Sequence, residues 1–384
     1  MTPAFEFAAP NRVVFGCGRA QEIGSLVRPL GERCLMFTGG RPERSAAVIA
    51  ALQLAGVNVE VITVRGEPTF DRVRGHVAAA LVYGPDVVVA MGGGSVIDTA
   101  KAVAMLLAQG GDPMDYAEVI GRGLPITIPS VPWVAIPTTA GAGAEATRNA
   151  VLVEPSQQAK VSLRSHLMLP SLVIIDPELT VSLPPSVTAA TGLDALSQLI
   201  EPYVSIKANP ATDALCRAGI PLVARSLRRA CEDPGDLTAR SDLALAAWWS
   251  GMALANAGLG AVHGFAGALG GMTDAPHGLL CARFLVPVCR ANVAALRAKP
   301  GGEPALFRYA DVGALLTGKA DISIDDGLDW LAAWIDSLPL PRLSAMPDRD
   351  AVIIAALRSS SMKGNPVALE RSMLAEVLAS VIAA

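Results

Sequence analysis

Three side chains in the second half of the sequence are of types that bind transition metals. Asp194 lies in the stretch TGLDALSQLIEPY (191–203), and His263 and His277 lie in the glycine-rich stretch AVHGFAGALGGMTDAPHGLLC (261–281). One carboxylate and two imidazoles suit Zn(II) or Fe(II) with a position left open for a substrate. The alternative is a pair of structural core histidines. We favour metal binding because the chain has only four histidines and the residues around these two are too small to be their partners.

Gln198 follows Asp194 by four residues in a predicted helix, so both side chains point from one face. An aspartate and a histidine at this spacing would indicate a metal site directly, but the amide oxygen of glutamine is a weaker, neutral ligand for a transition metal. Two predictions stay open. In the first, Gln198 binds the metal through its amide oxygen, and the site holds the metal with reduced affinity. In the second, Gln198 hydrogen-bonds a substrate carbonyl at a site that works without metal.

Two loops rich in small residues predict a nucleotide site in the first half. The stretch DVVVAMGGGSVIDTAK (86–101) joins an apolar strand to a helix, and PTTAGAGAEAT (137–147) follows another strand. Glycines let backbone N–H groups approach a phosphate closely, and a helix N-terminus adds partial positive charge. Each loop alone is equally compatible with a tight turn or a helix cap. The predicted contacts are Gly92, Gly93, Gly94, Ser95, Asp98, Thr138 and Thr139.

Alternating strands and helices in the first half must position these loops. The predicted strands are residues 12–15, 34–39, 58–64, 86–92, 133–138 and 171–177. Strand followed by helix, repeated, predicts a mostly parallel, Rossmann-like sheet, whose ligands bind at the carboxyl ends of the strands. After DPELTVSLPP the strand-like runs give way to long alanine- and leucine-rich helical segments. We therefore predict an α/β nucleotide-binding domain over residues 1–180 and an all-helical metal and substrate domain over residues 181–384.

Composition narrows the classes of partner. The 384 residues are 52% hydrophobic and 17% charged, with a net charge of −4 and no basic stripe, which excludes a nucleic-acid binder. We expect no signal peptide and no apolar run long enough to span a membrane, and therefore a cytoplasmic protein that acts on a small solute. Six cysteines without a CxxC pair argue against a zinc ribbon, and we interpret most of them as buried small hydrophobic residues.

Five motifs in order resemble the iron-containing (group III) alcohol dehydrogenase family, whose relatives include maleylacetate reductases. They are GGGSVIDTAK, PTTAGAGAEAT, DPELTVSLP, TAATGLDAL and the VHG and PHG pair. The match extends from Arg12 to Pro287. The resemblance implies NAD(P)-dependent interconversion of an alcohol and a carbonyl compound by hydride transfer, an α/β domain followed by a helical domain, and a homodimer.

The resemblance also assigns roles to single residues. It assigns residues 92–95 to the pyrophosphate loop, Thr138 and Thr139 to a second cofactor loop, and Lys160 to a place near the cofactor. Asp194, His263 and His277 correspond to three of four metal ligands. The fourth is a histidine in metal-dependent members and is Gln198 here, and a histidine near the substrate is replaced by Gly267. A bound metal would polarise the carbonyl. Without it, His263, His277 and Gln198 would act as hydrogen-bond donors.

The end of the second predicted strand bears on the choice of nucleotide. Many NAD-specific relatives carry an acidic residue there, whereas this chain has Gly39, Gly40 and Arg41. Arg41 can accommodate a 2′-phosphate. We therefore predict that NADP(H) is at least accepted.

Three other functions are compatible with parts of this pattern. The first is a metal-independent, maleylacetate reductase-like enzyme acting on a carboxylated substrate. Such relatives tend to lose the aspartate as well, so the presence of Asp194 favours a bound divalent ion. The second is a metal-dependent cyclase or lyase, which needs a pocket richer in basic residues. The third is a catalytically degenerate nucleotide-binding protein, which the survival of both loops and three ligands argues against.

Overall fold

The computed structural model describes residues 4–157, 159–343 and 347–383, and the chain divides into two compact units. The α/β unit comprises residues 8–139 and 143–181, and the helical unit comprises residues 4–7, 140–142 and 182–383. The main boundary lies between Val181 and Ser182, one residue after the predicted one. The short segments 4–7 and 140–142 also belong to the helical unit, so a single cut in the sequence does not describe the division.

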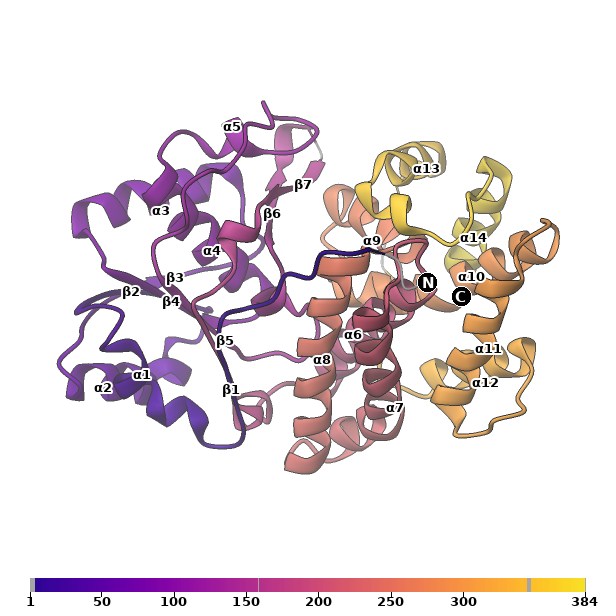
Figure 1. Ribbon diagram of the computed structural model, residues 1–384, viewed down its shortest axis with the longest axis horizontal. Coiled ribbons are helices and arrows are strands. Elements are labelled where there is room, and N and C mark those ends of the chain that lie inside the picture. The colour runs from indigo at the N-terminus through magenta and orange to yellow at the C-terminus, as the bar shows by residue number, and fades with distance from the viewer. Residues whose placement is uncertain (1–3, 158, 344–346, 384) are drawn as a thin grey trace. The chain divides into compact units, whose positions relative to one another are not determined.

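The α/β unit contains a six-stranded parallel sheet in the order β1-β8-β5-β4-β2-β3 (Figure 1). Its strands are β1 Val13–Phe15, β2 Arg33–Thr38, β3 Asn58–Thr63, β4 Val87–Gly92, β5 Trp133–Pro137 and β8 Leu172–Ile175. All six predicted strands are confirmed to within two residues at each end. The predicted fold class, an α/β domain with a mostly parallel sheet followed by a helical domain, is therefore confirmed.

Strand β4 shows why the sheet forms. All six of its residues are buried, and it lies between β5 and β2. A continuous apolar run of this kind is typical of a central parallel strand covered by helices on both faces. The helices of this unit are α1 Ile23–Val27, α2 Ala46–Leu54, α3 Phe70–Tyr83, α4 Gly94–Gln109 and α5 Pro113–Tyr116. One apolar core packs α1 and α2 against Met36 and Val89.

An antiparallel hairpin, β6 Asn149–Glu154 and β7 Ala159–Arg164, was not predicted from the sequence. It is tied to α4 by two charged side chains. Lys101 is fully buried, and its ammonium donates hydrogen bonds to the carbonyl oxygens of Ala144, Thr147 and Asn149 and to the Thr147 hydroxyl, at 2.7 to 3.0 Å. Asp98 accepts a hydrogen bond from the Val151 amide at 3.1 Å. The chain between β5 and β6 is thereby wrapped around one lysine.

The helical unit is built around α6, which is buried at nearly every position from Thr188 onward. Helices α7 and α8 pack against α6 and against each other, and α10 packs against both α6 and α9 (Figure 1). The helices are α6 Pro185–Val204, α7 Pro210–Glu232, α8 Leu237–Ala257, α9 Ala261–Met272, α10 His277–Arg297, α11 Glu303–Thr317, α12 Ile324–Asp336, α13 Arg349–Arg358 and α14 Arg371–Ala383. A single large apolar core joins them.

Helix α10 corrects one expectation. By length and composition alone, it could cross a membrane. The pair α8 and α9, bent by 99°, passes the same test if the two helices are counted as one span. The sequence-based expectation that no segment reaches this threshold is therefore wrong. However, 67% of the apolar window of α10 is buried inside the protein. Its hydrophobicity is accounted for by its place in the core of the helical unit.

Candidate functional site

Helix α6 supplies a row of polar side chains in the helical unit. Asp194, Gln198 and Glu201 follow one another at spacings of four and three residues, so they lie along one face of the helix, and all three are buried. Polar groups buried in a core need partners. Those partners come from α8, α9 and α10.

Helices α9 and α10 bring two imidazoles and a thiol to this row. His263 lies in the first turn of α9, His277 is the first residue of α10, and Cys281 follows one turn later on the same face. Gly278 allows the start of α10 to approach α6 closely, because a Cβ at this position would lie 2.6 Å from the Ala190 carbonyl oxygen. The N-terminus of α10 can therefore carry His277 up to the row on α6.

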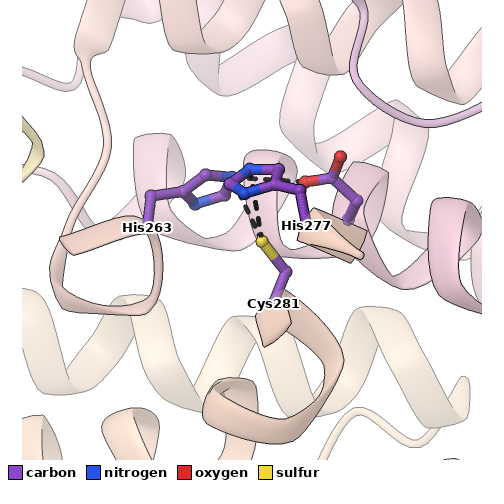
Figure 2. Close-up of side chains that lie close together, drawn as sticks. His263, His277 and Cys281 are labelled. Carbon is purple, nitrogen blue, oxygen red and sulfur yellow. Dashed lines mark hydrogen bonds and ion pairs between the residues drawn. The ribbon is translucent and has the colours of Figure 1, made fainter. Parts of the chain in front are cut away.

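Asp194, His263, His277 and Cys281 form a tight cluster, which we call the ligand cluster. Each contributes one ligand atom, and these four atoms lie within 4.8 Å of one another. The His263 Nε2 atom is 3.3 Å from Asp194 Oδ1. The Cys281 Sγ atom is 3.7 Å from the Nε2 atoms of both His263 and His277. Figure 2 shows the two rings and the thiol pointing toward one another.

Three of these separations are close to the edges of a tetrahedral metal site. With metal–nitrogen and metal–oxygen bonds of about 2.0 to 2.1 Å and a metal–sulfur bond of about 2.3 Å, tetrahedral edges are about 3.3 Å between nitrogen and oxygen and about 3.6 Å between nitrogen and sulfur. The observed values are 3.3 and 3.7 Å. The donor set of one oxygen, two nitrogens and one sulfur also suits a transition metal. The residues present therefore fit a divalent transition-metal ion.

Two further side chains hold the ligands in place. Glu201 Oε2 lies 2.6 Å from His263 Nδ1, so the other ring nitrogen faces the cluster. A carboxylate on the far nitrogen of a metal-binding histidine fixes the ring orientation and raises its basicity. Gln198 donates from Nε2 to Asp194 Oδ1 at 2.9 Å, and its Oε1 accepts from the Ser250 hydroxyl of α8 at 2.9 Å. Both ends of the Gln198 amide are therefore engaged by protein groups.

The electrostatics of the cluster favour a positive charge at its centre. Burial alone would raise the pKa of Asp194, but the His263 hydrogen bond and the charges of His277 and His263 outweigh it and lower that pKa. Burial alone would lower the pKa of His263, but Cys281, Glu201 and Asp194 together hold it well above 6.5. Burial raises the pKa of the Cys281 thiol to about 12. A cation placed here would be stabilised by two carboxylates.

The α/β unit contains a cavity of about 440 Å³ at the carboxyl ends of β2 and β4. It gathers six of the residues predicted to bind the cofactor: Gly39, Gly40, Arg41, Gly92, Gly93 and Thr138. Its other lining residues are Thr38, at the end of β2, and Arg44, Ser45 and Met91, which no sequence motif indicated. The Thr38 hydroxyl is buried and has no hydrogen-bond partner within the described protein. We call this space the nucleotide cavity.

The N-terminus of α4 opens beside the nucleotide cavity. Gly94 and Ser95 form its first turn, and Gly93 occupies the N-cap without a side-chain capping hydrogen bond. The glycine before it, Gly92, is required by packing, because a Cβ there would lie 2.5 to 2.9 Å from three carbons of Val96. A Cβ on Gly93 would meet only Thr139, at 3.4 Å. Backbone donors at an uncapped helix start can bind phosphate.

Asp98 and Lys160, also predicted to bind the cofactor, have partners within the α/β unit. Asp98 Oδ1 lies 3.6 Å from the Lys101 ammonium, and burial raises the pKa of its carboxyl. Lys160 pairs with Glu67 at 3.0 Å. Among the described residues, the lining of the nucleotide cavity includes neither of them. Their contact with a cofactor stays a prediction.

The sequence matches the models of two protein families. The family described as iron-containing alcohol dehydrogenase matches residues 10–177. The C-terminal part of the Fe-containing alcohol dehydrogenase family matches residues 188–341.

Individual proteins and structures of this family are also similar to this chain. The 1,3-propanediol dehydrogenase of Klebsiella pneumoniae is 37% identical over 298 residues, which cover 76% of each chain. The NAD-dependent methanol dehydrogenase of Bacillus methanolicus is 34% identical over 294 residues, covering 75% of this chain and 76% of that protein. An alcohol dehydrogenase structure from Oenococcus oeni superposes with a TM-score of 0.90 at 29% identity, covering 98% of this chain and all of that one.

Proposed function

Because this chain belongs to the iron-containing alcohol dehydrogenase family, we propose that its ligand cluster holds a catalytic divalent metal, Zn(II) or Fe(II). The protein is an oxidoreductase that interconverts an alcohol and an aldehyde or ketone by hydride transfer with a nicotinamide cofactor. The observation that carries the metal proposal is the ligand cluster itself. Its Asp194, His263 and His277 come from three helices, and their ligand atoms converge within 4.8 Å.

The roles of the chain's residues follow from their contacts. A bound divalent metal supplies a Lewis acid that stabilises negative charge on the substrate oxygen. His263 keeps its Nε2 directed at the cluster because Glu201 holds Nδ1. Gln198 fixes the Asp194 carboxylate and is itself fixed by Ser250. We therefore assign Asp194, His263 and His277 to metal binding, and Glu201 and Gln198 to positioning.

We propose that the nucleotide cavity binds the cofactor. The uncapped start of α4 supplies backbone donors for the pyrophosphate. Thr38, Gly39, Gly40 and Arg41 line the cavity at the end of β2, where a ribose is recognised in sheets of this kind. None of these four residues is acidic, and the Arg41 guanidinium can bind a 2′-phosphate. NADP(H) should therefore be accepted as well as NAD(H).

Changing Arg41 tests the nucleotide preference. Arg41→Ala should lower kcat/KM for NADPH about 10-fold and leave that for NADH within about 2-fold, since only NADPH carries the phosphate. Arg122→Ala, which removes an exposed arginine of the same unit outside the cavity, is the matched control. A wild-type protein that prefers NADH clearly, or an equal loss for both nucleotides, would remove Arg41 from this role.

The metal proposal is tested on untagged protein purified without chelators. Elemental analysis should find near-stoichiometric zinc or iron, and oxidation of NAD(P)H with a panel of carbonyl compounds should stop after EDTA and return when the metal is restored. Turnover that persists in metal-free protein would favour the metal-independent reductase. The absence of turnover with every carbonyl, despite bound nucleotide, would favour the degenerate nucleotide-binding protein.

We further propose that the protein is cytoplasmic, as expected from its sequence, and that it is a homodimer, as the family resemblance implies. Light scattering coupled to size exclusion should give about 79 kDa, twice the 39.6 kDa of one chain. A mass near 40 kDa at micromolar concentration would contradict a dimer.

A further inference from the structure

The ligand cluster has a fourth member that the sequence reasoning did not assign. Cys281 lies in it with Asp194, His263 and His277. Resting on the metal proposed above, we propose that the Cys281 thiolate is the fourth metal ligand of this chain. In this arrangement Gln198 is not a ligand and acts only by positioning Asp194. The site then contains one carboxylate, two imidazoles and one thiolate, and the substrate oxygen would approach the metal as a fifth ligand, an expansion that catalytic zinc sites undergo.

The backbone geometry directs Cys281 into the site. It follows His277 by four residues on α10, so the two side chains lie on one face one turn apart. The Sγ atom is equally far, at 3.7 Å, from the Nε2 atoms of His263 and His277. A sulfur placed symmetrically between two imidazole nitrogens, at a distance close to a tetrahedral edge, occupies the position of a ligand.

Gln198 is held away from this position by its own hydrogen bonds. A ligand needs its oxygen directed at the metal, but Gln198 Oε1 accepts from Ser250 and its Nε2 faces Asp194. If the amide were rotated by 180°, its oxygen would face the Asp194 carboxylate. Two hydrogen-bond acceptors facing each other are unfavourable. The amide is therefore better suited to fixing the carboxylate than to binding the metal.

Charge supports the same assignment. A divalent ion buried in this core is costly unless anionic groups compensate it. Among the groups that could bind the metal directly, Asp194 supplies one negative charge, neutral Gln198 would supply none, and a Cys281 thiolate would supply a second. The Glu201 carboxylate adds a charge from behind His263. On binding, the thiol loses its proton to solvent as the metal–sulfur bond forms, so one proton is released for each thiol that binds.

The thiolate changes which metals the site prefers. Sulfur ligands favour the softer ions, so Zn(II), Co(II) and Cd(II) should bind more tightly relative to Fe(II) and Mn(II) than at a site without a thiolate. Although the family is described as iron-containing, this chain should therefore retain zinc in preference to iron when both are offered.

Cobalt is the probe that reports a thiolate ligand directly. Protein stripped by a chelator and reloaded with Co(II) should show visible d–d bands and a near-ultraviolet thiolate-to-cobalt charge-transfer band. Cys281→Ser should keep the d–d bands and lose the charge-transfer band. Cys216→Ser, which alters another fully buried cysteine of the helical unit outside the ligand cluster, should keep both. The control also reports the effect of one buried serine on folding.

Three results would overturn the assignment. A charge-transfer band that persists in Cys281→Ser, or d–d bands without it in the unchanged chain, would mean that cobalt binds without this thiol. The absence of all cobalt bands, with turnover intact, would overturn the proposed metal function together with this inference. The first two outcomes leave the metal function standing.

A second pair of variants separates ligand loss from misfolding. Cys281→Ser should weaken zinc binding by more than the about 10- to 100-fold typical of losing a group that only supports a ligand, measured by competition with a chromophoric chelator. Adding Gln198→His to Cys281→Ser should recover most of that affinity, because an imidazole then returns to the position where metal-dependent relatives carry one. It should not bring back the charge-transfer band. Recovery of the band would show that another cysteine is the ligand.

Discussion

The nucleotide cavity and the ligand cluster are built in opposite ways. The cavity lies at strand ends and a helix start, and it is lined mostly by glycine, serine and threonine, with arginine as its charged side chain. The cluster is assembled from the side chains of Asp194, His263, His277 and Cys281 on α6, α9 and α10. One site therefore depends on where the backbone runs, and the other depends on which side chains the helices carry.

This difference predicts how each site responds to change. A site made of backbone donors tolerates many side-chain replacements but fails when a Cβ displaces the loop. A site made of ligands fails when one ligand is removed, even if every helix keeps its place. Substitutions in the two units should thus separate nucleotide binding from metal binding.

The largest effect is expected in the ligand cluster. His277→Ala removes a metal ligand at the start of α10 and should lower kcat about 100-fold or more. The Kd for nucleotide, measured by fluorescence titration, should stay within a factor of about two, since the nucleotide cavity belongs to the other unit. An unchanged kcat would remove His277 from the mechanism, and a large rise in Kd would break the separation of the two sites.

A pair of glycine variants sharpens the comparison in the α/β unit. Gly92→Ala and Gly93→Ala should both raise the Kd for nucleotide about 10-fold without changing metal content. Only Gly92→Ala should also lower Tm, because its Cβ lies 2.5 to 2.9 Å from Val96 carbons whereas that of Gly93 has 3.4 Å of room. Equal loss of Tm, measured by calorimetry, together with an unchanged Kd would show that the two glycines serve packing alone.

A further prediction concerns the pH dependence of stability in the α/β unit. Burial raises the pKa of Glu145 from 4.5 to about 7. Its protonated form is therefore favoured by folding, and this stabilisation is complete below about pH 4.5 and lost as pH rises through about 7. Glu145→Gln should remove this pH dependence, which is about 3 kcal/mol in total. Urea denaturation at pH 5 and pH 8 measures it, with the exposed Glu43→Gln as control. An unchanged pH profile would contradict the assignment.

Sequence patterns revealed the parts of the protein that local chemistry determines. The six strands of the sheet were visible as short apolar runs, and the loop at Gly92 and Gly93 was visible as glycines between a strand and a helix. The hairpin β6 and β7 was missed because its strands are only partly apolar and it is held by tertiary contacts of Asp98 and Lys101.

The ligand cluster was only partly predictable, because its membership depends on how helices pack. Asp194, His263 and His277 stood out as residue types rare in a core. The cysteines were interpreted as buried small residues, and five of the six are buried, but Cys281 has a second property. Its spacing of four from His277 was a signal available in the sequence. Nothing local indicates that Ser250 of α8 lies against Gln198.

The buried lysine of α4 has a consequence for how the α/β unit assembles. Four oxygens of the chain between Ala144 and Asn149 surround the Lys101 ammonium, as the oxygens of a crown ether surround a guest ion. Backbone carbonyl oxygens arranged in this way are also ligands that a calcium ion can take. Here the cation is the Lys101 side chain, which is covalently part of the same chain as the loop. The loop therefore needs no free ion to take its shape, and dilution cannot remove its cation.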